Sequence, residues 1–170
     1  MADKLRYLTT QDLLWLNMEI TGEPQTYRFD KLEEATAYQY TRGQYDPHTQ
    51  AARFALGWRR QRPFHQGNEA TGFVATLAFL HANDIPLTLE DGQALAWWRD
   101  LPSDPSSLTQ ALQGATQAGH VHAYHNVVDF KEILLEILAA YPEAVAALRN
   151  EAPTPMREMA RTRLTGELIR

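Results

Sequence analysis

The chain has 170 residues and a mass of 19.4 kDa, and its 44% of hydrophobic and 22% of charged residues are typical of one globular domain with a sizeable core. A formal charge of −5 gives no overall attraction to nucleic acid or to an anionic membrane, and no stretch approaches the roughly 18 apolar residues of a membrane span. Cysteine is absent, which excludes disulfides, thiolate metal sites and cysteine nucleophiles. Because the first residues lack the apolar run of a signal peptide, a cytoplasmic protein is the simplest expectation.

The N-terminal region predicts two helices. Thr9 and Thr10 can cap the first, whose leucine and isoleucine residues repeat at helical spacing until Gly22 ends it. Asp30 can cap the second, from Lys31 to about Tyr40. Glycine and proline then mark a break before the next helical pattern begins.

Helical patterns continue through the rest of the chain, and no convincing strand stands out. From His48 to Gln61, apolar residues recur at the spacing of one helix face, and residues 71–82 are apolar nearly all round, which predicts a buried helix. Four later segments have apolar faces, the first of them capped by Thr88: residues 88–101, 108–118, 127–140 and 156–169. The sequence therefore predicts an all-α single domain over residues 1–170, with a core of about residues 5–120 and a helical C-terminal extension of about residues 121–170.

The loop RPFHQGNEAT, residues 62–71, is the segment of the sequence that could form a phosphate-binding site. Asn68 is a good N-cap for the helix that follows, and a helix N-terminus offers free N–H groups and a partial positive charge to an anion. Gly67 lets a ligand approach the backbone closely. A glycine–asparagine loop before a buried helix is more often only a cap, so these two residues alone indicate a phosphate site weakly.

A longer segment, residues 51–85, resembles the Fic/Doc (Fido) family, in which a loop of the form HPFx(D/E)GN(G/K)R joins two helices of an all-α core. With YLTTQDLLWLNMEITG near the N-terminus, which is similar to the first Doc helix, the resemblance covers roughly residues 5–100. It implies a Fic/Doc-like helical bundle. The loop residues that match the family are Pro63, Phe64, Gly67 and Asn68, followed by Thr71, a threonine common in Doc-like members.

The same loop departs from the family where the resemblance implies chemistry. Arg62 occupies the position of the histidine general base, Gln66 that of the Mg²⁺-binding acid, and Glu69 and Ala70 those of the basic residues that hold phosphate. A guanidinium stays protonated and cannot act as a base, and a neutral amide is a poor Mg²⁺ ligand. We therefore expect no catalytic residue in the loop. His65, three residues after the expected base, is a weak candidate.

These departures predict a catalytically degenerate Fic/Doc-like pseudoenzyme that acts by binding a protein or a nucleotide, in a toxin–antitoxin (death on curing) or prophage-derived setting. Two alternatives stay open: an active transferase that moves AMP (AMPylation) or phosphate onto a protein hydroxyl, and a homo-oligomeric structural or interaction protein. ATP and Mg²⁺ are expected only if the family activity survives. The expected partner is an antitoxin-like or other protein, with nucleic acid and membrane not expected. The candidates for nucleotide or anion contact are Arg62, Phe64, Gln66, Gly67, Asn68 and Thr71.

Three histidines, His120, His122 and His125, lie close together and could supply ligands to Zn²⁺ or Ni²⁺, although a polar loop is the simpler interpretation. The inhibitory Ser/Thr-x-x-x-Glu-(Gly/Asn) motif of many Fic proteins has its nearest match at Thr154 to Glu158, where the last position fails.

The segment WRRQRPFH joins aromatic and basic residues, a combination that can bind nucleic acid. The patch is short and the chain is acidic, so we interpret Arg59 and Arg60 as the solvated face of a helix and Trp58 as a core residue. Of the adjacent Trp97 and Trp98, we expect one to be buried and the other to lie toward a groove or a partner.

Overall fold

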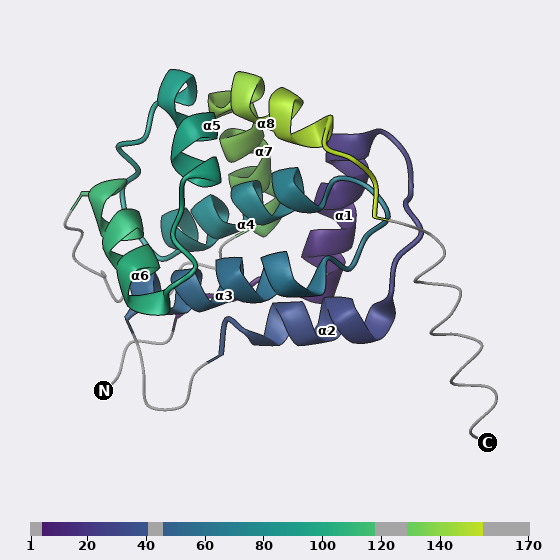
Figure 1. Ribbon diagram of the computed structural model, residues 1–170, viewed down its shortest axis with the longest axis horizontal. Coiled ribbons are helices and arrows are strands. Elements are labelled where there is room, and N and C mark those ends of the chain that lie inside the picture. Colours follow the sequence, from purple (N-terminus) through teal and green to yellow (C-terminus); the bar gives the residue numbers. More distant parts are fainter. Residues whose placement is uncertain (1–4, 41–45, 118–128, 155–170) are drawn as a thin grey trace.

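The computed structural model describes residues 5–40, 46–117 and 129–154. Within these ranges the structure contains eight α-helices and no strand, so the expected all-α fold is confirmed for the described residues (Figure 1). The helices are α1 (Thr10–Thr21), α2 (Phe29–Ala37), α3 (Pro47–Gln61), α4 (Asn68–Ala82), α5 (Asp91–Arg99), α6 (Pro105–Gly114), α7 (Phe130–Ala140) and α8 (Pro142–Arg149). None of these described helices combines the length and the apolar character needed to cross a bilayer.

Helix α4 is the centre of the fold, and Figure 1 shows the other helices arranged around it. It packs against α1, α3, α7 and α8, and 13 of its 15 residues are buried, as its apolar pattern predicts. Gly72 allows α3 to approach closely, because a Cβ atom there would lie 2.5 Å from Cδ1 of Trp58. The N-terminal end of α4, where the loop from α3 enters, is therefore fixed on several sides.

The C-terminal helices close the core over α4. Leu134 and Ile137 of α7 and Leu148 of α8 belong to the same buried cluster as the core of α3 and α4. Asp91 at the start of α5 caps α8, since its carboxylate accepts hydrogen bonds from the backbone N–H groups of Glu143 at 3.1 Å and of Ala144 at 3.0 Å. The N-terminal ends of α5 and α8 are thus joined.

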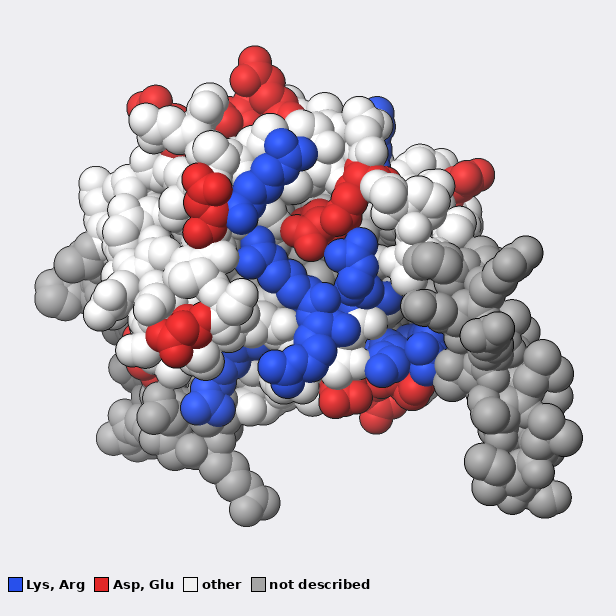
Figure 2. All heavy atoms as spheres, viewed as in Figure 1, with Lys and Arg blue, Asp and Glu red and all other residues white. Residues whose placement is uncertain are grey.

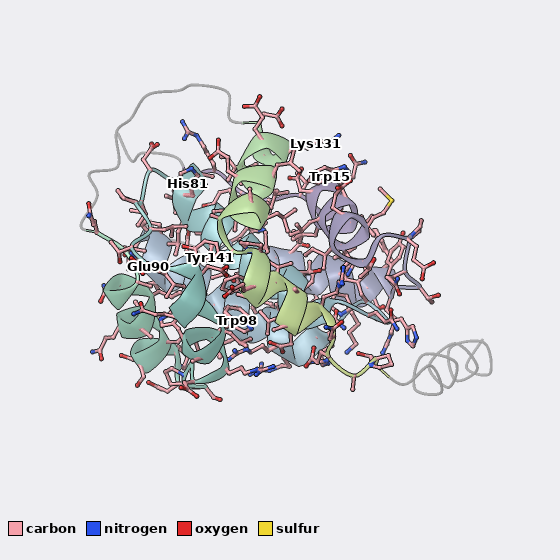
Figure 3. The ribbon with its side chains drawn as sticks, turned by 90° about the horizontal axis from the view of Figure 1, so that it is seen from above. Trp15, His81, Glu90, Trp98, Lys131 and Tyr141 are labelled. Atoms are coloured by element: carbon pink, nitrogen blue, oxygen red, sulfur yellow. The ribbon has the colours of Figure 1, made fainter. Side chains whose placement is uncertain are left out.

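Side-chain contacts to α1 and α4 hold α7 in place (Figure 3). Nζ of Lys131 lies 5.7 Å from the centroid of the Trp15 ring on α1, and Nε2 of His81 on α4 lies 3.1 Å from the Glu136 carboxylate. Tyr141, between α7 and α8, donates its hydroxyl to the carbonyl of Leu89 at 2.6 Å. These contacts make the C-terminal helices a part of the same folded body as α4.

Several helix ends differ from the sequence prediction. Arg28, not Asp30, is the N-cap of α2, and Asp30 lies in its first turn. Helix α5 begins at Asp91 rather than after Thr88, because the backbone of Thr88 bonds to Ala115 at the end of α6, and Leu87 forms an isolated bridge with Thr116. Helix α6 begins at Pro105, since Asp104 caps it and proline is well suited to the first helical position. The predicted helix over residues 156–169 lies outside the described residues.

Candidate functional site

The loop between α3 and α4 is held by a short antiparallel pairing with the segment that follows α1. The N–H of His65 donates to the carbonyl of Thr26, and the N–H of Arg28 donates to the carbonyl of Pro63, both at 2.9 Å. Tyr27 and Phe64 form the bridge between these two hydrogen bonds. The loop is therefore fixed on the side that faces α2.

Gly67 adopts a left-handed backbone, with φ 80° and ψ 14°, and is the N-cap of α4. A Cβ atom at this position would lie 2.8 Å from Cγ2 of Thr21 and 2.9 Å from Nδ2 of Asn17, both on α1. The same Asn17 amide donates to the carbonyl of Gln66 at 2.9 Å and to the hydroxyl of Thr71 at 3.2 Å. The close packing against α1 therefore accounts for a glycine at position 67, and no ligand is needed to explain it.

Asn68 is not the N-cap that the sequence predicts, but the first residue of α4. Its side chain is buried and turns back to the loop: Oδ1 accepts the N–H of Phe64 at 3.0 Å, and Nδ2 donates to the carbonyl of Phe64 at 2.6 Å. A third hydrogen bond, at 3.3 Å, runs from Nδ2 to the hydroxyl of Thr154. Both hydrogens of the amide are used inside the protein, so Asn68 shapes the loop.

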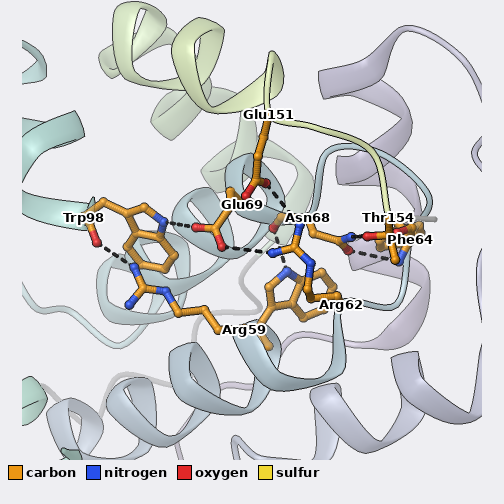
Figure 4. Close-up of polar contacts among 9 residues, drawn as sticks. Arg59, Arg62, Phe64, Asn68, Glu69, Trp98, Glu151 and Thr154 are labelled. Carbon is orange, nitrogen blue, oxygen red and sulfur yellow. Dashed lines mark hydrogen bonds and ion pairs between the residues drawn. The ribbon is translucent and has the colours of Figure 1, made fainter. Parts of the chain in front are cut away.

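Arg62 ends α3 in a left-handed conformation, with φ 43°, which is unusual for a residue other than glycine. Its guanidinium lies between two carboxylates, with Nη1 3.4 Å from Oε1 of Glu69 and Nη2 3.4 Å from Oε2 of Glu151 (Figure 4). The other oxygen of Glu69 accepts the indole N–H of Trp98 at 2.7 Å. The first turn of α4 therefore carries a carboxylate that is fixed on both of its oxygens.

Arg59 continues this network on the other side of Trp98. Its guanidinium lies over the indole ring, 4.6 Å from the centroid, and Nη2 donates to the carbonyl of Trp98 at 2.6 Å. The interpretation of Arg59 as a solvated side chain is therefore wrong in part, because Trp98 covers it, whereas Arg60 is exposed. The expectation that one of two adjacent tryptophans is buried is confirmed: Trp98 is buried, and Trp97 is partly buried.

The segment after α8 lies directly on the loop. The N–H of Thr154 donates to the carbonyl of His65, and Nδ1 of His65 lies 2.8 Å from the carbonyl oxygen of Thr154. A carbonyl oxygen only accepts, so Nδ1 carries the proton in this arrangement. Together with the contact from Asn68, these hydrogen bonds fix the segment after α8 to the loop.

The candidate residues for nucleotide or anion contact lie together at the junction of the loop and α4. Most of them are inaccessible, because Phe64, Gly67, Asn68 and Thr71 are buried, and only Arg62 and Gln66 retain exposed surface. The sequence did not link Trp98 or Glu151 to this site, since they lie 29 or more positions after Glu69 and no local pattern connects them to it. It indicated Thr154 only as the first residue of the imperfect match to the inhibitory motif.

The residues present do not fit a Mg²⁺-bound nucleotide. Position 66 offers an exposed amide in place of a carboxylate, and the carboxylate of Glu69 in the first turn of α4 already binds Arg62 and Trp98. Among the described residues, no group of three or more histidine, aspartate or glutamate side chains could hold a metal ion. The predicted metal ligands His120, His122 and His125 lie outside the described residues.

Comparison with protein-family models, with curated proteins and with solved structures finds no match. The resemblance to the Fic/Doc family therefore rests on the residues of the loop and its flanking helices.

Proposed function

We propose that this chain is a catalytically inactive, Fic/Doc-like protein that acts by binding another protein. The observation that supports this most directly is the side chain of Arg62, which takes the position of the family's general base and lies between Glu69 and Glu151. Two neighbouring carboxylates stabilise the positive charge of a guanidinium, which has no lone pair available for a proton. A group in this state cannot deprotonate a target hydroxyl.

The phosphate-binding role of the loop meets a second obstacle. Free N–H groups and the helix dipole make the start of a helix attractive to phosphate, but Glu69 in the first turn of α4 offsets that attraction with a negative charge. A phosphate would also have to displace Thr154 from Asn68 and His65. The side chains of Asn68 and Arg62 already bind groups of the protein itself, which supports protein binding over nucleotide binding.

The proposal is tested by incubating the purified protein with Mg²⁺ and a cell lysate, using ATP labelled at the α-phosphate in one sample and at the γ-phosphate in another. We expect no labelled protein above the level of a heat-denatured control. Label that appears at a rate proportional to the amount of added protein would contradict the proposal and favour the active transferase. The two labels would then distinguish transfer of AMP from transfer of phosphate.

A further inference from the structure

A cavity of about 340 Å³ opens next to the covered loop, where the C-terminal ends of α3, α5 and α8 meet the first turn of α4. Its lining combines two arginines, two glutamates and the apolar side chains of Ala147 and Leu148. The lining residues are Arg59, Glu69, Arg99, Ala147, Leu148, Asn150 and Glu151. On this face of the molecule, lysine and arginine side chains gather near the centre, with acidic side chains beside them (Figure 2).

The side chain of Arg59 is preorganised for binding an anion. The ring of Trp98 holds its guanidinium at 4.6 Å, and the Trp98 carbonyl accepts a hydrogen bond from Nη2. A guanidinium has five N–H donors, so most of them are left for a ligand. Because stacking already fixes the orientation of the side chain, little rotamer freedom is lost when a ligand binds.

Arg99 supplies the second positive charge. It is the last residue of α5, it is exposed, and no ion pair to it is found in the part of the chain that the structure describes. Two guanidinium groups at one cavity favour a carboxylate or another planar oxyanion, which can accept paired hydrogen bonds.

The glutamates decide which kind of anion fits. Glu69 is bound by Trp98 and Arg62, whereas Glu151 is more exposed and contacts Arg62 at 3.4 Å. A chain of phosphates would meet both carboxylates, so nucleic acid is disfavoured. A ligand that carries a positive group beside its carboxylate would instead pair with both the arginines and the glutamates, with Leu148 against its aliphatic part.

We propose that this cavity binds a protein segment in which an acidic residue is next to a basic one. The acidic side chain contacts Arg59 and Arg99, and the basic side chain contacts Glu151. The inference rests on the proposed function, because it names the chemistry of the partner that the protein would bind. A ligand that carries only carboxylates, such as a run of glutamates, pairs with the arginines and leaves Glu151 without a basic partner from the ligand.

The test is fluorescence anisotropy of a labelled octapeptide of alternating glutamate and lysine, titrated with the full-length protein at an ionic strength of about 0.15 M. We expect saturable binding that is tighter than that of an all-glutamate octapeptide or of a short oligothymidylate. Arg99→Gln should weaken the binding up to about fivefold, the upper end of the range for one exposed ion pair. The matched control is Arg53→Gln, an exposed arginine of α3 outside the cavity, which should change the affinity less than about twofold because salt screens distant charges.

A charge reversal at Glu151 gives a second, independent measurement. Glu151→Lys should weaken binding of the alternating peptide and strengthen binding of the all-glutamate peptide. The absence of saturable binding, equal effects of the Arg99 and Arg53 substitutions, or tighter binding of the oligothymidylate would each overturn the inference. The titration contains no ATP, so label transfer from ATP would contradict the proposed function without deciding this result.

Discussion

The indole N–H of Trp98 donates to Oε2 of Glu69 at 2.7 Å, and this hydrogen bond joins the last turn of α5 to the first turn of α4. The opposite oxygen of Glu69 contacts Arg62, so one carboxylate connects three elements of the site. A glutamate that would repel an incoming phosphate is therefore a structural residue in this fold.

Replacement of Trp98 by phenylalanine keeps a buried ring but removes the N–H that Glu69 accepts. We expect the free energy of unfolding to fall by about 2 kcal/mol, from the smaller ring and the lost hydrogen bond. In a double-mutant cycle with Glu69→Met, which has a similar length but no oxygen to accept the N–H, equilibrium urea unfolding should give a coupling free energy of about 1 kcal/mol. Strictly additive effects would show that the hydrogen bond contributes nothing to stability.

Asn68 should be required for folding stability rather than for a ligand. Asn68→Ala removes hydrogen bonds to both backbone groups of Phe64 and leaves these buried groups unsatisfied, so we expect a loss of about 2–4 kcal/mol in urea unfolding. The control is Gln66→Ala, an exposed position in the same loop, where the change should stay within about 0.5 kcal/mol. Equal stabilities of the two variants would contradict this role for Asn68.

Two glycines should respond to alanine in opposite directions. At Gly67, the left-handed backbone and the close approach of Thr21 and Asn17 make a Cβ atom costly, and we expect a loss of more than about 1 kcal/mol. Gly92 lies inside α5 with an ordinary helical backbone, and a Cβ atom added there would meet no other atom within 4 Å. Gly92→Ala should therefore stabilise the protein by about 0.5–1 kcal/mol, because alanine has the higher helix propensity. Thermal or urea unfolding of both variants measures the contrast.

Local patterns are sufficient to predict α1 and the burial of α4. Thr9 and Asp12 form the reciprocal hydrogen bonds of a capping box, and Gly22 ends the helix in the left-handed conformation, as the sequence indicates. The continuous apolar run of α4 has no polar face and needs neighbours all round. In both cases the deciding interactions lie within a few residues along the chain.

Features that depend on distant residues could not be predicted in this way. Asparagine is a residue type that favours the N-cap, but the amide of Asn68 binds Phe64 and Thr154. The second of these contacts spans 86 positions. Helix α8 is absent from the sequence prediction because Pro142 indicates an end to α7, whereas proline also suits the first position of a new helix. The orientation of Arg59 depends on Trp98, 39 positions away.

Restoring a basic residue at position 69 should return anion affinity but not turnover. The neighbouring position cannot be restored too, because Ala70 is fully buried and has no room for arginine. Glu69→Lys reverses the charge at the start of α4, and we expect sulfate or ATP to raise the thermal midpoint of this variant, with no label transfer to protein, since a base is still lacking. Glu132→Lys, the same change at an exposed position of α7, controls for net charge. Turnover by Glu69→Lys would refute the prediction.

His48 should make stability depend on pH below its ordinary pKa. Its Nε2 lies 2.8 Å from the hydroxyl of Thr116, which links α3 to the end of α6, and burial lowers the pKa of His48 below 6.5 despite the nearby Asp46 carboxylate, which acts in the opposite direction. The unfolded chain therefore binds the proton more tightly than the folded one. The contribution is fully present above pH 6.5 and is lost as the pH falls through the folded pKa.

This pH dependence can be isolated with His48→Gln, which keeps an amide near the position of Nε2 and removes the titrating group. Urea unfolding of wild type and variant over a series from neutral to mildly acidic pH should give curves that run parallel above pH 6.5 and converge below it, because only the wild type loses the contribution of neutral His48. Carboxylates titrate in both proteins and cancel in the difference. A difference in free energy of unfolding that stays constant across the series would mean that burial of His48 does not penalise its charged form.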